Sequence, residues 1–487
     1  MDDAFETVIG LECHVELSTR TKMFCGCPTT FGAPPNTQVC PVCLGLPGTL
    51  PVPNEAAIAA IVKIGLALGC AIAPDSCFHR KNYFYPDMPK DFQISQYDLP
   101  ICVGGRLEVE VDGALRTIGI TRVHMEEDTG KTTHAGESGR IGRADYALVD
   151  YNRAGVPLVE VVSEPDIRTP EEARAYLLEL RAVLASLDVS DVRMEEGSLR
   201  CDANISVRRR GEPTFGTRVE IKNLNSVRSL ERALRSEEIR HREAIERGER
   251  IVQETRHYDE ESDTTHSLRS KEEAFDYRYF PEPDIPRLAP EAAWIEGIRA
   301  ALPELPAARR ARYTGAGIGL APEQARVLVD DRDLSAFFDA TLAASPPVAP
   351  RPLATWITQN LTAALNDRGL ALAASPLTPD GFAEVVRLVE DGTVSATAGK
   401  QVLEAVLETG RSATEIVEER GLTQVSDAGA LETWVDEVLA AHPDEVAAYR
   451  GGKQGLLGFF TGQVMQRSRG SANPKAVGEL LRARLDG

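Results

Sequence analysis

Apolar side chains occupy every second position from Ile9 to Leu17 within residues 7–17, and this pattern limits the fold of the chain more than any other feature. Successive side chains of a β-strand point to opposite faces, so one face of this segment is entirely apolar. The other face carries Glu12, His14 and Glu16. The pattern predicts a strand with a buried back and a front that presents acids and an imidazole.

Two later segments show related patterns. In 156–162, Glu160 stands alone among apolar residues, and in 200–207 the alternation puts Asp202 on a polar face. A carboxylate in an apolar strand needs a cation or a hydrogen-bond partner, although a single acid on a strand is more often simply solvated. Taken with the acids at 126–128, the strands predict an oxygen-rich site with one imidazole. Such a site suits Mg²⁺ or Mn²⁺ better than zinc, and these ions commonly bind phosphates.

Four of the nine cysteines form two close pairs, Cys25 with Cys27 and Cys40 with Cys43, twelve residues apart. Two thiol pairs at this spacing in a reducing compartment favour a tetrahedral zinc site. A disulfide, a redox pair and unligated thiols are the alternatives. Four thiolates leave no open coordination position, so the zinc would be structural.

Composition narrows the class of protein. A chain of 487 residues is expected to form two to four domains, and its formal charge of −20 argues against a general polyanion-binding surface. The N-terminus lacks the basic start and apolar run of a signal peptide. The apolar stretch 56–73 contains Lys63 and two glycines, so it reads as a core helix capped by Asn54. We expect a cytoplasmic protein.

Proline-rich stretches at 281–290 and 346–352 divide the chain. Strand patterns and motif-rich loops dominate before the first stretch, and short Ala/Leu/Glu-rich helices dominate after it. The predicted class is α+β: a β-rich N-terminal domain followed by two all-α domains. Two further helices are expected in the first part, from the capping box at Thr169–Glu172 to Leu187 and from about Ser226 to Gly248. The charges of the second helix favour a solvated face with paired side chains.

Several long motifs occur in one order, and together they resemble a known family. They are the segments 10–17, 80–87, 93–98, 124–128, 163–168, 194–206 and 276–284. The set is similar to the B subunit of the glutamine-dependent aspartyl/glutamyl-tRNA amidotransferase. The resemblance spans essentially the whole chain and is densest in residues 5–290. Loop 136–150 looks longer than is usual in that family.

The resemblance implies an activity, cofactors and partners. It implies a ligase that forms a carbon–nitrogen bond with glutamine as amido donor (EC 6.3.5.-). The B subunit would act with a glutaminase, the A subunit, and with a small C subunit. It would use ATP to phosphorylate the side-chain carboxylate of Glu-tRNA(Gln) or Asp-tRNA(Asn), which ammonia then amidates. The implied domains are a cradle at 1–290 with a zinc-binding insertion at 25–43, a helical domain at 291–408 and a small tRNA-contacting tail at 409–487.

The resemblance also implies residue roles. Predicted magnesium ligands are Glu12, His14, Glu127, Glu160 and Asp202, and predicted catalytic residues are Lys81, Arg80 and Glu126. The two bases would contact the phosphate or the substrate carboxylate. Phosphoryl transfer requires positioning and charge neutralisation more than a protein nucleophile, which agrees with this residue set.

The tail is locally basic. Residues 450–487 hold seven basic against two acidic side chains, and the candidates for RNA contact are Lys453, Arg467, Arg469 and Lys475. A merely basic helix end is the alternative. Two other functions remain open: a freestanding metal-dependent phosphohydrolase and a non-catalytic zinc-bearing RNA adaptor. The sequence does not choose between Asp-tRNA(Asn) and Glu-tRNA(Gln).

Overall fold

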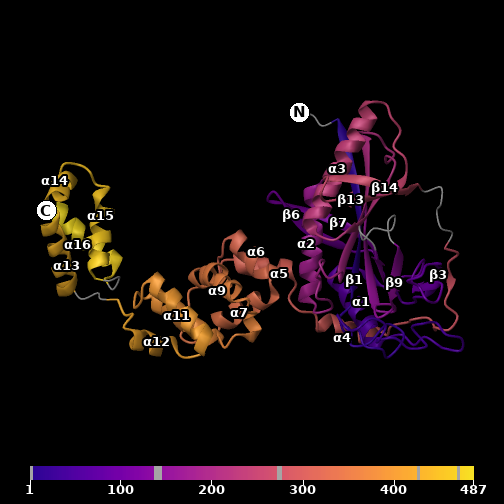
Figure 1. Ribbon diagram of the computed structural model, residues 1–487, viewed down its shortest axis with the longest axis horizontal. Helices are drawn as coiled ribbons and strands as arrows, with labels where there is room; N and C mark the ends of the chain where they lie inside the picture. The colour runs from indigo at the N-terminus through magenta and orange to yellow at the C-terminus, as the bar shows by residue number, and fades with distance from the viewer. Residues whose placement is uncertain (1–3, 136–144, 271–276, 425–427, 469–471, 487) are drawn as a thin grey trace. The chain divides into compact units, whose positions relative to one another are not determined.

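The computed structural model describes residues 4–135, 145–270, 277–424, 428–468 and 472–486, and it divides into two compact units (Figure 1). Residues 1–306 form a sheet-based unit, and residues 307–487 form a helical unit. The predicted α+β class is confirmed. The division into two units does not test the predicted limits of three domains, 1–290, 291–408 and 409–487, which stay predictions.

Within the described residues, thirteen strands form one mixed sheet and two more form a separate hairpin. Along the main path the order is β14-β13-β12-β11-β1-β10-β7-β4-β3-β15, while β5 and β6 pair with β7 and β2 pairs with β5. The main-sheet strands are β1 (Phe5–Glu16), β2 (Ala71–Ile72), β3 (His79–Asn82), β4 (Phe92–Ser95), β5 (Cys102–Val103), β6 (Arg106–Val111), β7 (Ala114–Glu127), β10 (Pro157–Ser163), β11 (Leu199–Arg209), β12 (Val219–Leu224), β13 (Glu254–Asp259), β14 (Thr264–Ser270) and β15 (Phe280–Pro281). The hairpin consists of β8 (Lys131–Ala135) and β9 (Tyr146–Asp150).

The apolar face of the sheet packs against helices. Those of the first unit are α1 (Glu55–Ala67), α2 (Pro170–Ser186), α3 (Val227–Glu246) and α4 (Ala292–Ala300), and Figure 1 shows α2 and α3 beside the strands. Apolar residues of α1, α2 and α3 share one buried cluster with the alternating residues of β1, β7, β10 and β11. The opposite face of the central strands is left to polar side chains.

The sequence predictions for these elements are confirmed. Ile9, Leu11, Cys13 and Val15 of β1 are at most 1% exposed, as the alternation requires. Helix α1 begins after Asn54, whose side chain accepts from the backbone N–H groups of residues 56 and 57.

The predicted cap of α2 and the predicted start of α3 are also present. Thr169 caps α2 by accepting from Glu172 N–H, and the Glu172 carboxylate turns back to the N–H of Arg168. Helix α3 begins after its cap Ser226. One side of α3 is solvated with paired charges, as expected, but Glu237 and His241 on this helix are fully buried. Arg240 and Arg256 contact the Glu237 carboxylate.

The second unit consists of short helices around two separate apolar clusters, one within 313–417 and one within 431–485. Its elements are α5 (Pro306–Thr314), α6 (Pro322–Asp330), α7 (Arg332–Leu342), α8 (Pro350–Thr355), a π-helical segment (Trp356–Leu361), α9 (Thr362–Arg368), a 3₁₀ turn (Leu372–Ala374), α10 (Pro379–Glu390), α11 (Ala396–Thr409), α12 (Ala413–Arg420), α13 (Ala428–Ala441), α14 (Pro443–Arg450), α15 (Leu456–Arg467) and α16 (Pro474–Asp486). Across the described part of the chain, no helix combines the length and apolar character needed to cross a bilayer.

Candidate functional site

Strand register brings acids and imidazoles from three strands into one row on the polar face. His14 of β1 lies opposite Glu160 of β10, and Glu160 lies opposite His124 of β7. Directly opposed residues share a face, so all three side chains point the same way. Glu126 lies two residues beyond His124 on β7 and points to the same face.

These side chains form a compact cluster. Glu160 Oε2 lies 3.4 Å from His14 Nε2 and 3.5 Å from His124 Nε2. Glu126 Oε1 lies 3.5 Å from His124 Nε2 and accepts from Ser95 Oγ at 2.8 Å. Donor atoms of His14, Glu126 and Glu160 lie within 4.8 Å of one another. Two carboxylates and one imidazole form a donor set that fits a divalent cation.

The cluster keeps its acids ionised. Burial works to raise the pKa of Glu160, but His124 and His14 outweigh it and hold the pKa at about 2. The pKa of Glu126 is also lowered, because Lys81 and His124 together outweigh the effect of burial. Burial works against the charged form of His14, yet its contact with Glu160 raises the His14 pKa. A concentration of ionised carboxylates on a buried face is an environment that attracts a cation.

The two basic residues among the predicted catalytic residues, Lys81 and Arg80, lie on opposite faces of the sheet. Lys81 is on the face of the cluster, and although burial works to lower its pKa, Glu126 raises the pKa above the usual value. Its Nζ lies 5.0 Å from the centre of the Tyr277 ring. Arg80 points to the other face, where its guanidinium donates to Glu282 at 2.6 and 2.9 Å. The structure therefore brings Lys81, and not Arg80, toward the acids.

Two predicted magnesium ligands share the polar face but lie farther along it. Glu12 and Asp202 oppose each other on β1 and β11, two residues from the His14 row. Glu12 accepts from Asn204 at 3.0 Å, and Asp202 accepts from Lys222 Nζ at 3.1 Å. Burial, followed by the charge of Glu160, raises the pKa of Glu12.

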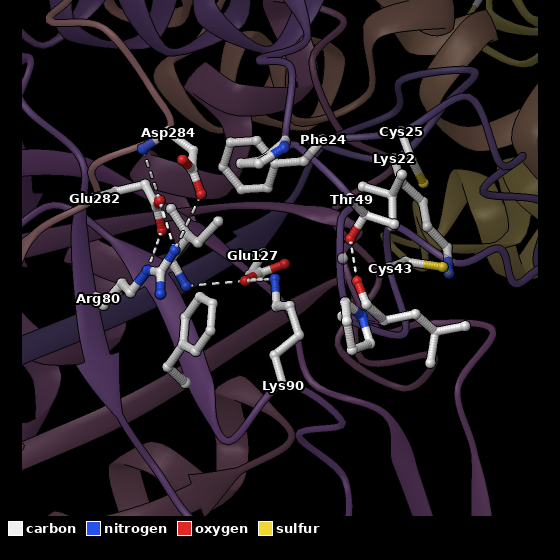
Figure 2. Close-up of a pocket in the computed structure, with 18 of the residues that line it drawn as sticks. Lys22, Phe24, Cys25, Cys43, Thr49, Arg80, Lys90, Glu127, Glu282 and Asp284 are labelled. Atoms are coloured by element: carbon white, nitrogen blue, oxygen red, sulfur yellow. Dashed lines mark hydrogen bonds and ion pairs between the residues drawn. The ribbon is translucent and has the colours of Figure 1, made fainter.

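Glu127 does not join the cluster, because it points to the opposite face of β7 from Glu126. Its carboxylate contacts Lys90 Nζ and accepts from Ile94 N–H at 2.9 Å. There it lines a cavity of about 280 Å³ together with Lys22, Lys90 and Arg80, which Figure 2 shows. The structure therefore does not bring Glu127, predicted as a magnesium ligand, to the cluster that contains His14.

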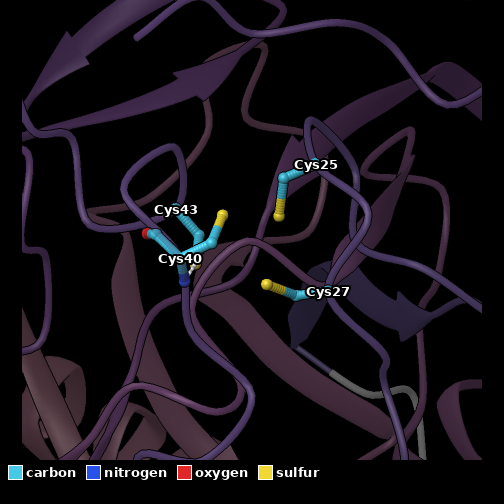
Figure 3. A group of neighbouring side chains, drawn as sticks. All are labelled: Cys25, Cys27, Cys40 and Cys43. Atoms are coloured by element: carbon cyan, nitrogen blue, oxygen red, sulfur yellow. Dashed lines mark hydrogen bonds between the residues drawn. The ribbon is translucent and has the colours of Figure 1, made fainter.

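The four predicted zinc ligands lie close together (Figure 3), and two of them, Cys25 and Cys43, line this cavity. Their sulfur atoms lie within 4.8 Å of one another, and Cys40 Sγ and Cys43 Sγ are 4.0 Å apart. The two sulfur atoms of a disulfide lie about 2.05 Å apart. Tetrahedral zinc with Zn–S bonds of about 2.3 Å places its sulfur ligands about 3.8 Å from one another. The thiol set fits zinc. Lys22, which is 1% exposed, donates to Cys43 Sγ at 3.7 Å and to the Tyr151 carbonyl at 3.1 Å.

The predicted RNA contacts in the tail differ in their surroundings. Lys453 precedes α15 and Lys475 lies in the first turn of α16, and both are exposed. Arg467 is exposed but contacts Glu437. Arg469 and positions 136–144 of the long loop lie outside the described residues.

Comparison with known proteins decides the family. Residues 7–296 match the family model described as the GatB/GatE catalytic domain, and residues 336–485 match the model described as the GatB domain. The chain belongs to this family. Relatives named as the B subunit of aspartyl/glutamyl-tRNA(Asn/Gln) amidotransferase include one from Carboxydothermus hydrogenoformans, 51% identical over 99% of both chains. Others come from Moorella thermoacetica, 53% identical over 99% of this chain and 100% of the relative, and Anaeromyxobacter sp. strain K, 54% identical over 99% of both. The family resemblance predicted from the motifs is confirmed.

Within the family's catalytic domain, sequence reasoning missed His124, Ser95 and Gln93 as contacts of the cluster. Gln93 Nε2 lies 3.3 Å from Glu126 Oε2, next to the bond from Ser95. A signal for His124 is present in the sequence, because His124-x-Glu126 has the spacing of Glu12-x-His14. Ser95 and Gln93 lie in the motif 93–98, but their contact with Glu126 depends on the pairing of β4 with β7, which the motif does not reveal.

Proposed function

We propose that this chain, within a glutamine-dependent tRNA amidotransferase, activates a tRNA-borne carboxylate. The observation that carries the proposal is the cluster of His14, Glu126 and Glu160 with Lys81 on the same face. Family membership supports the reaction class, since the matched relatives are named amidotransferase B subunits. The partners would be the glutaminase (the A subunit), the small C subunit and tRNA(Asn) or tRNA(Gln) carrying Asp or Glu, and the location would be cytoplasmic.

The proposed reaction has two steps. An oxygen of the side-chain carboxylate attacks the γ-phosphorus of ATP, and ADP leaves. The nitrogen of ammonia, released from glutamine by the glutaminase, then attacks the acyl carbon, and phosphate leaves with the electron pair of the broken C–O bond. The first step is needed because a carboxylate is a poor acyl donor until one oxygen becomes a good leaving group.

The residues of the cluster divide this work. His14, Glu126 and Glu160 would hold Mg²⁺, with Glu12 and Asp202 on the same face as further acids near it. Bound there, the ion would neutralise charge on the phosphate oxygens. Lys81 would orient the phosphate or the substrate carboxylate, because its ammonium faces the same space. Ser95 and Gln93 fix the Glu126 carboxylate.

Zinc and RNA contacts complete the proposal. Cys25, Cys27, Cys40 and Cys43 would bind a structural Zn²⁺, supported by sulfur spacings that fit tetrahedral coordination. Lys453 and Lys475 would contact the tRNA backbone, with Arg467 and Arg469 as further candidates.

The test is amidation by the chain reconstituted with its partner proteins, ATP, glutamine and misacylated tRNA. We expect His14→Ala and Glu160→Gln to slow ATP-dependent product formation by about 10²-fold or more. His257→Ala, at an exposed histidine of β13, is the matched control. Full activity of both cluster variants would refute the site. Hydrolysis of phosphate esters by the chain alone, without tRNA or partners, would favour the phosphohydrolase instead.

A further inference from the structure

Five tyrosines form a row along the edge of the polar face, next to Lys81. They come from three separate segments of the chain and are, in spatial order, Tyr85, Tyr83, Tyr277, Tyr279 and Tyr97. The row is not part of the metal-type cluster. Its position at the β3 and β15 edge follows from strand pairing, since Phe280 opposes Arg80 and so places Tyr279 on the face of Lys81.

The row contains two stacked pairs. The rings of Tyr97 and Tyr279 lie 4.3 Å apart with planes at 9°, and those of Tyr83 and Tyr85 lie 5.4 Å apart at 15°. Tyr277 joins the pairs, because it meets Tyr279 edge-on at 6.0 Å and its carbonyl accepts from the backbone N–H of Asn82, which precedes Tyr83.

One interior member of the row, Tyr279, borders the cluster. Burial raises the pKa of Tyr279 to about 12, and the charges of Lys81, Glu126 and Glu160 all act on its hydroxyl. The outer members are open to solvent: Tyr97 is 56% exposed, Tyr85 is 47% exposed and the adjacent Phe84 is 77% exposed. Both ends of the row are therefore open to solvent, and the stacked pair of Tyr97 and Tyr279 connects solvent with the proposed site of phosphoryl transfer.

We propose that this tyrosine row stacks the terminal bases of the single-stranded acceptor end of an RNA substrate. The inference rests on the proposed function, in which the amino acid that carries the reacting carboxylate is esterified to the terminal ribose. That linkage forces the last bases to lie beside the cluster. Aromatic rings bind unpaired bases by stacking without regard to sequence. The exposed rings of Tyr97 and Tyr85 offer faces to more than one base, whereas a nucleotide presents a single base.

A fluorescent base reports the contact independently of catalysis. The probe is the tRNA with 2-aminopurine as its terminal base, bound to the reconstituted complex of the chain with its partner proteins. Stacking quenches 2-aminopurine, so we expect quenching with the wild-type chain and with Tyr97→Phe, which keeps the ring. Tyr97→Ala should lose most of the quenching, and Phe215→Ala, an exposed aromatic outside the row, should not.

Kinetics give the second arm. Tyr97→Ala is expected to raise the KM for tRNA about tenfold while leaving kcat and the KM for ATP unchanged. Unaltered quenching in Tyr97→Ala would overturn the proposal. A raised KM for ATP, or relief of the quench by ATP alone, would assign the row to the nucleotide base and would also overturn it. Because quenching needs no turnover, an inactive wild-type complex that still quenches would refute the proposed function without refuting the stacking site.

Discussion

Glu126 and Glu127 are neighbours in the sequence, yet their carboxylates lie on opposite faces of β7. Glu126 contacts His124 and Ser95 in the acid cluster, whereas Glu127 contacts Lys90 and lines the cavity of Figure 2. The two residues therefore belong to different chemical environments, and substitutions at them should have different consequences.

We predict that Glu126→Gln weakens Mn²⁺ binding by at least about tenfold, because it removes a charged oxygen donor from the cluster. Glu127→Gln should leave Mn²⁺ affinity nearly unchanged and instead destabilise the fold by about 3 kcal/mol, because the buried ammonium of Lys90 loses its partner. Calorimetric Mn²⁺ titration and thermal unfolding of the two purified variants measure both effects. The reverse assignment, with Glu127→Gln losing the metal, would show that the ligand set predicted from the motifs is right.

This pair also shows what the sequence could not settle. Alternation within residues 7–17 correctly predicts the two faces of β1, because every position on the buried face from Ile9 to Leu17 is apolar. In His124–Asp128 both faces carry polar groups, so alternation alone does not reveal which acid faces the cluster. The pairing of β7 with β10 and β4 decides it, and such long-range register is not encoded in a local pattern.

Other elements were predictable for local reasons. The caps at Asn54, Thr169 and Ser226 act through side-chain bonds to residues two or three positions away, so the sequence contains the whole interaction. The buried contacts of Glu237 connect α3 to Arg256 on β13, whereas the local charge pattern of α3 predicts a solvated face. The tyrosine row was missed for the same reason, since it joins three distant segments.

The ionised carboxylate of Glu237 should make the folding stability of the protein depend on pH in the acidic range. Burial works to raise the pKa of Glu237, but contacts with His241, Arg240 and Thr265 hold it at about 2, below its ordinary 4.5. A lowered folded-state pKa stabilises the protein above about pH 4.5, and this contribution is lost as pH falls from about 4.5 toward about 2. Glu237→Gln should therefore lower the melting temperature at about pH 7, and the gap to wild type should narrow below about pH 4.5.

Glu243→Gln is the matched control for that experiment, since Glu243 lies on the same helix and its side chain is 58% exposed beside Arg247. It should shift the melting temperature little at either pH. A gap for Glu237→Gln that stays constant from about pH 7 to about pH 3 would show that the carboxylate is not held ionised.

The cysteine cluster should contain one zinc per chain. Cys43→Ser is expected to abolish zinc, measured by elemental analysis of the purified protein, and to lower the melting temperature, because a structural metal site contributes directly to folding. Cys70→Ser is the control, as Cys70 is also buried but lies in the core away from the cluster. Wild-type protein purified without zinc, with a melting temperature unaffected by chelator, would contradict the assignment.

The basic tail should contribute to tRNA binding through charge alone. Each phosphate contact adds close to one unit to the slope of log K against log salt, so Lys453→Ala and Lys475→Ala should each reduce that slope by about 1 and weaken binding uniformly across tRNA species. Arg467→Ala should have a smaller effect, because its guanidinium already contacts Glu437. Filter binding of the reconstituted complex at a series of salt concentrations measures the slopes. An unchanged slope in the double variant of Lys453 and Lys475 would exclude these residues from the RNA interface and leave the basic helix end as the explanation of the charge.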